Sequence, residues 1–143
     1  MRKEQIFIRI ILYGFLAGAV ITDLWRNKIY NLWVIPELVA GVTLCALRGP
    51  DAFKNSLLAI LAAFLVCLPV YMLKGIAAGD VKLIMSTASF LSLQELYSCI
   101  LYSFLIAGAI SLLVIIFKKN KQRTIHFALP VMMSTCLTLG GFL

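Results

Sequence analysis

Long apolar runs alternate with short polar segments along most of this chain. A helix that crosses a membrane needs about 20 mostly apolar residues, and several of the runs approach that length. The pattern predicts six helices, at residues 5–22, 30–47, 55–73, 80–93, 96–117 and 125–142. The segment 80–93 is apolar but short for a full crossing, so a second signal must decide whether it crosses the membrane.

The distribution of basic residues favours a crossing at 80–93. If this segment crosses, eight of the 13 Lys and Arg residues lie on one side of the membrane, namely Arg26, Lys28, Lys74, Lys82, Lys118, Lys119, Lys121 and Arg123. The others lie on the far side or in the first helix, and they are Arg2, Lys3, Arg9, Arg48 and Lys54. Because basic loops are retained in the cytoplasm, we expect the first, third and fifth loops there and both termini outside. The basic N-terminus is the feature that opposes this orientation.

Composition supports the same class of protein. Of the 143 residues, 62% are hydrophobic and only 13% are charged, with a mean hydropathy of +1.00. Soluble domains carry about 25% charged residues, so a soluble fold would have too little polar surface here. Basic loops near anionic lipid headgroups account for the net charge of +7, and no motif indicates nucleic-acid binding. We predict an all-α polytopic membrane protein with one domain over residues 1–143.

The residues that bind metals or act as nucleophiles form no familiar motif. The four cysteines fall in four different apolar runs without a CxxC pair, and they are Cys45, Cys67, Cys99 and Cys136. They are interpreted as apolar packing residues rather than as a zinc or redox site. The single histidine is not part of an HExxH motif, and no GxSxG motif is present. We expect neither a metal nor a cofactor.

Two aspartates stand at the ends of apolar runs. Asp23 follows the first run and Asp80 opens the fourth, so six crossings place both on the cytoplasmic side at the same depth. An ionisable residue at a membrane helix is costly and indicates function. Two neighbouring carboxylates share a proton, so one can activate water while the other donates to a carbonyl oxygen. The alternative is that each aspartate lies in headgroup water, paired with Arg26 or Lys82.

Four other residues have two readings each. Gly79 either lets a substrate strand approach the loop before Asp80 or marks a helix boundary. Lys82 either acts on Asp80 or on substrate, or is a solvated interfacial lysine. For Glu37, inside the second predicted helix, polar packing between helices is favoured over a role at the active site. For His126, an interfacial position is favoured over a catalytic role.

Two segments resemble the signatures of a known family. The segment Asp23–Asn31 (DLWRNKIYN) resembles the first-aspartate signature of type IV prepilin peptidases, D-x5-I-P-N. The segment Gly75–Leu83 (GIAAGDVKL) resembles their second signature, G-x-G-x-G-D-x-K-L. The segment His126–Pro130 (HFALP) resembles the P-F-x-P segment at the start of their last helix. Ala77 replaces a glycine, and Tyr30 replaces the proline.

The resemblance to these membrane aspartic proteases implies a function. It implies an aspartic endopeptidase that removes the leader of prepilin-like precursors (type IV or Flp pilins) at the cytoplasmic face of the inner membrane, without a cofactor. The catalytic residues would be Asp23 and Asp80, and the supporting or substrate-loop residues would be Gly79, Lys82, Ala77 and Asn31. The chain resembles the short, peptidase-only type that serves tight-adherence pili, so no methyltransferase domain is expected.

Two other classes of function are considered. A small transporter would use the aspartates to relay protons or cations. A non-catalytic factor for pilus assembly would not need either carboxylate. The two aspartate signatures on one side of the membrane weigh against both classes, and leader cleavage is the observation that separates them from a peptidase.

Overall fold

The structure of this protein is a computed structural model that describes residues 2–117 and 126–140. Within these residues the regular secondary structure is helical. The six helices are α1 (Arg2–Arg26), α2 (Asn31–Arg48), α3 (Pro50–Met72), α4 (Ala78–Ala88), α5 (Leu93–Phe117) and α6 (Ala128–Thr138). Four of them, α1, α2, α3 and α5, are long and apolar enough to cross a membrane. The prediction of an all-α, multi-pass membrane protein is confirmed.

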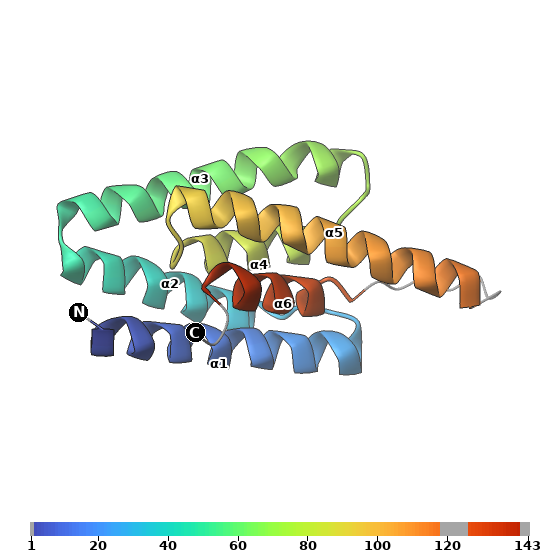
Figure 1. The fold of residues 1–143 in the computed structure, drawn as a ribbon, viewed down its shortest axis with the longest axis horizontal. Helices are drawn as coiled ribbons and strands as arrows, with labels where there is room; N and C mark the ends of the chain where they lie inside the picture. Colours follow the sequence, from blue (N-terminus) through green and yellow to red (C-terminus); the bar gives the residue numbers. More distant parts are fainter. Residues whose placement is uncertain (1, 118–125, 141–143) are drawn as a thin grey trace.

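Successive helices run in alternating directions along one axis (Figure 1). The loops after α1 and α3 and the start of α6 therefore lie at one end of the bundle, which we name the loop end. The opposite end holds the start of α1 and the loops after α2 and α4 (Figure 1). The tight turn between α2 and α3 contains Gly49 with φ 133°, a conformation that favours glycine, and Pro50 at the first position of α3.

The two short helices lie among the four long ones. Helix α4 packs against α2, α3 and α6, and helix α6 packs against α1, α4 and α5. Each has 11 residues and is therefore about 16 Å long, about half of the thickness of a hydrocarbon core. Their ends leave backbone groups that lipid cannot satisfy. Each helix buries one side in the bundle, whereas the first residues of α4 and the last residues of α6 are exposed or only partly buried.

Several predicted boundaries were wrong by a few residues. Helix α1 continues to Arg26, so Asp23 lies in its last turn rather than after it. Helix α4 ends at Ala88 instead of 93, and α5 begins at Leu93 instead of 96. A capping box explains the second shift, because Ser92 donates its N–H to Glu95 at 2.8 Å and accepts the Glu95 N–H at 3.4 Å.

For the last loop and the last helix, only part of the prediction can be compared with the structure. Helix α6 begins at Ala128 rather than at 125. The predicted cytoplasmic residues of the fifth loop lie outside the described residues, and they are Lys118, Lys119, Lys121 and Arg123.

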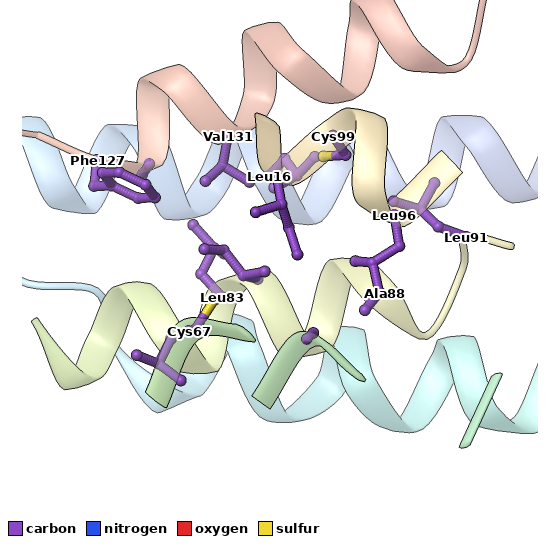
Figure 2. Packing of buried hydrophobic residues seen from close by; sticks show 14 of the residues in the cluster. Leu16, Cys67, Leu83, Ala88, Leu91, Leu96, Cys99, Phe127 and Val131 are labelled. Carbon is purple, nitrogen blue, oxygen red and sulfur yellow. The ribbon is translucent and has the colours of Figure 1, made fainter. Parts of the chain in front are cut away.

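Apolar side chains from five helices meet in the centre of the bundle. Figure 2 shows Leu16 of α1, Leu83 of α4 and Val131 of α6 pointing toward one another, with Cys99 of α5 beside them. The leucine side chains are fully buried there. All four cysteines are free, and Cys67 and Cys99 are buried in this core. The core fixes the relative positions of α1 and α4, which carry the two aspartates.

A buried carboxylate joins α2 to α4. Glu37 is fully buried and accepts hydrogen bonds from Ser86 Oγ at 2.9 Å and from Thr87 Oγ1 at 3.2 Å. Buried polar groups must be paired in this way. Glu37 therefore belongs to polar packing between helices, as the sequence favoured, and it does not line either of the clefts described below.

Candidate active site

Asp23 and Asp80 meet at the loop end of the bundle. Asp23 comes from the last turn of α1, and Asp80 comes from the first turn of α4. Both line one cleft of about 400 Å³, which we name the loop cleft. Its other lining residues are Asn27, Lys28, Ile29, Tyr30, Asn31, Ala77 and Gly79. The alternating order of the helices thus brings together two carboxylates that are far apart in the chain.

The carboxylate of Asp23 is enclosed by the start of α6. Its side chain is 9% exposed, and its Oδ2 accepts the N–H of Ala128 at 3.4 Å. The Nδ1 atom of His126 lies 3.7 Å from Oδ1. The N-terminus of a helix carries a partial positive charge that favours an anion. Asn27, with φ 51° and its N–H bonded to the Asp23 carbonyl at 2.9 Å, ends α1 just beyond this carboxylate.

The carboxylate of Asp80 has a different environment. Asp80 is the third residue of α4, and its Oδ2 accepts the N–H of Ala77 at 2.9 Å. This is one half of a capping box, which favours an acidic residue at this position. Burial raises the pKa of Asp80 from 3.8 to about 6. The hydrogen bond from Ala77 opposes this rise in pKa, and the charge of Asp23 adds to it.

Four further residues of the two signatures hold α4 against the first loop and the start of α2. The Nζ atom of Lys82 donates to Asn31 Oδ1 at 3.5 Å, and this contact joins α4 to the start of α2. A Cβ atom placed on Gly79 would lie 3.4 Å from the Cβ of Ile29. The first turn of α4 therefore approaches the loop after α1 closely. Lys82 bonds to Asn31 in this arrangement, not to Asp80.

The charge pairing considered as the alternative is absent. In the part of the chain that the structure describes, the ion pair that forms joins Asp23 to His126. Neither Arg26 nor Lys82 pairs with an aspartate there. Sequence reasoning favoured a merely interfacial His126 and missed this contact, because no spacing or periodicity links the residue to Asp23.

A larger cleft adjoins the loop cleft, and we name it the α5 groove. Its volume is about 780 Å³, and Ala77 and Asp80 line both clefts. Its other lining residues are Tyr71, Met72, Lys74, Gly75, Ile76, Phe104, Ala107, Gly108, Ser111 and Phe127. A Cβ atom on Gly108 would have no neighbour within 4 Å, so this wall of the groove is open. Asp80 thus stands where the loop cleft and the α5 groove meet.

Comparison with known proteins adds one match. A model described as the type IV leader peptidase family matches residues 10–112. The matched segment includes Asp23, Asp80 and the residues between them, and it ends before His126. No curated protein and no solved structure matches the chain.

Proposed function

The chain belongs to the type IV leader peptidase family, which consists of aspartic-type prepilin peptidases, and on this premise we propose that Asp23 and Asp80 activate the water that cleaves a prepilin-like substrate. The observation that carries the proposal is that two carboxylates from separate helices line one cleft in unlike environments. Asp23 faces the N-terminus of a helix and an imidazole, whereas burial favours the protonated form of Asp80.

Unlike environments suit acid–base hydrolysis of an amide. One carboxylate takes a proton from water as the water oxygen attacks the carbonyl carbon of the scissile bond. The other gives its proton to the carbonyl oxygen, which yields a tetrahedral intermediate. The leaving nitrogen then takes up a proton as the C–N bond breaks. The reaction consumes one water, and both carboxylates return to their initial states.

We propose a path for the substrate through the two clefts. A prepilin-like precursor has a short basic leader followed by an apolar segment. We assign the leader to the loop cleft, which has polar walls at Asn27 and Asn31, and the apolar segment to the α5 groove. The scissile bond then lies beside Asp80, which lines both clefts. Gly79 and Ala77 support this arrangement by allowing α4 to begin close to the first loop.

We propose that the loop end faces the cytoplasm. By sequence, the loops that follow α1, α3 and α5, with Arg26 and Lys82 at their edges, hold eight of the 13 Lys and Arg residues, and positive charge is retained on the cytoplasmic side of a membrane. A cytoplasmic site suits a leader that has not yet crossed. The organisation as a single peptidase domain over residues 1–143, without methyltransferase activity, stays a prediction.

Leader cleavage by the purified enzyme tests this function. The enzyme is reconstituted in liposomes with a purified prepilin-like precursor, and the products are identified by intact-mass spectrometry. We expect a single cut between the basic leader and the apolar segment. An intact precursor, together with proton or cation uptake by the same liposomes, would instead identify a transporter. An intact precursor without uptake would favour an assembly factor.

A further inference from the structure

His126 forms an ion pair with Asp23 in the described structure. Its Nδ1 atom lies 3.7 Å from Asp23 Oδ1, and its side chain is 31% exposed. The peptide N–H of Ala128, two residues further on, reaches Oδ2 of the same carboxylate at 3.4 Å. Each oxygen of Asp23 therefore faces a nitrogen from the start of α6. The arrangement suits an anion at Asp23 better than a protonated acid.

The other charged groups around Asp23 come from two elements. Asp80 of α4 and Lys28 of the loop after α1 line the same cleft. The carboxylates of Asp80 and Asp23 are coupled, because ionisation of one disfavours ionisation of the other. The donor to Asp80 is the Ala77 N–H at 2.9 Å, and no imidazole contacts Asp80 in the described residues. The two carboxylates are thus supported differently, and His126 supports only one of them.

We propose that His126 is a positioning residue that keeps Asp23 ionised, so that Asp23 takes the proton from water and Asp80 delivers the proton to the carbonyl oxygen. This assignment rests on the proposed function and adds roles to its two carboxylates. His126 itself neither touches substrate nor transfers a proton. An imidazole generally carries a proton in the acid range where carboxylates titrate.

The assignment balances the protons of the reaction. Asp23 receives a proton from the attacking water, and Asp80 gives its proton to the carbonyl oxygen as the tetrahedral intermediate forms. When the C–N bond breaks, Asp23 passes its proton to the leaving nitrogen. Asp80 recovers its proton as the carbonyl is restored. Asp23 ends ionised and Asp80 ends protonated, as they began.

The experiment measures kcat and KM against pH for leader cleavage by purified, reconstituted enzyme. The variants are His126→Asn, which removes the charge, and His126→Lys, which keeps a positive charge. Lys54→Gln is the control, because it removes one positive charge from an exposed position at the opposite end of the bundle. His126→Gln replaces His126→Asn if the latter is not monodisperse in detergent.

We expect His126→Asn to move the acid limb of the kcat profile up by about one pH unit. Its kcat on that limb should fall about tenfold, with KM changed less than about twofold. His126→Lys and Lys54→Gln should keep the parental limb. A His126→Asn enzyme with the parental acid limb, at any absolute rate, would overturn the assignment. An inactive Asp23→Asn in the same assay would support the proposed function whatever the result for His126. An active Asp23→Asn would overturn both the proposed function and the role of His126.

Discussion

Lys82 donates a hydrogen bond to Asn31, and this contact joins the two signature segments of the chain. The Nζ–Oδ1 distance is 3.5 Å, and the residues come from α4 and from the first turn of α2. Close packing of Gly79 against Ile29 joins the same two segments a few residues away. The segments that carry Asp23 and Asp80 are therefore held together as one unit at the loop end of the bundle.

The contact between α4 and the first loop leaves little room at Gly79. We expect Gly79→Ala to cleave near the parental rate, because a Cβ atom there meets Ile29 at 3.4 Å, an ordinary contact distance. Gly79→Val adds two methyl groups beyond that Cβ atom and should lower the cleavage rate at least about tenfold by pushing Asp80 away from the first loop. Gly14→Val is the control, because nothing lies within 4 Å of a Cβ atom there. Parental cleavage by Gly79→Val would show that the close approach is unimportant.

The α5 groove should respond to a side chain that fills it. We expect Gly108→Leu to raise the KM for a prepilin-like substrate at least about fivefold, since the leucine would occupy space assigned to the apolar segment. The fold should tolerate the change, because a Cβ atom at Gly108 has no neighbour within 4 Å. Gly14→Leu, at an equally open glycine outside the groove, should keep the parental KM. Equal KM values for both variants would show that the apolar segment of the substrate does not bind in this groove.

Asp80 should reduce stability as the pH rises. Its pKa is raised from 3.8 to about 6 in the folded protein, so the folded state binds this proton more tightly than the unfolded chain does. The contribution of Asp80 to stability is then fully present below about pH 3.8 and is lost as the pH rises through about 6. We expect Asp80→Asn to raise the Tm in detergent at pH 8 and not at pH 4. A Tm difference that is the same at both pH values would contradict a buried, proton-binding Asp80.

The orientation of the bundle can be tested with two exposed lysines. Lys28 lies at the loop end and Lys54 at the opposite end. In a background without Cys45, Cys67, Cys99 and Cys136, we expect an impermeant thiol reagent to label Lys54→Cys in intact cells. Lys28→Cys should be labelled only after the membrane is opened. The reverse pattern would place the loop end outside the cell.

Local patterns were sufficient to predict the helices and the convergence of the aspartates. Each apolar run is a local signal, and an even number of crossings between Asp23 and the start of the fourth run places the two on one side. The early end of α4 could not be predicted. Its last carbonyls accept local N–H groups, and the carbonyl of Ser89, just after the helix, accepts a hydrogen bond from Ser56 Oγ at 2.9 Å. The donor of that bond lies in α3, so the hydrophobic pattern of residues 80–93 does not indicate it.

The contact between His126 and Asp23 was also beyond local patterns. The last helix was expected to begin at 125, but its position against α1 depends on packing with α5 and α4. A lone histidine before an apolar run is compatible with many environments. Only the three-dimensional arrangement places its imidazole 3.7 Å from one particular carboxylate.

Loss of leader cleavage in two single variants tests the central claim most directly. Asp23→Asn and Asp80→Asn are compared with Asp51→Asn, which changes an exposed carboxylate at the opposite end of the bundle. The rate of leader release from a prepilin-like precursor is measured by mass spectrometry at equal amounts of monodisperse enzyme. We expect Asp23→Asn and Asp80→Asn each to lose at least about 100-fold in rate, while Asp51→Asn keeps the parental rate. Cleavage at the parental rate by either Asp23→Asn or Asp80→Asn would contradict the two-aspartate mechanism.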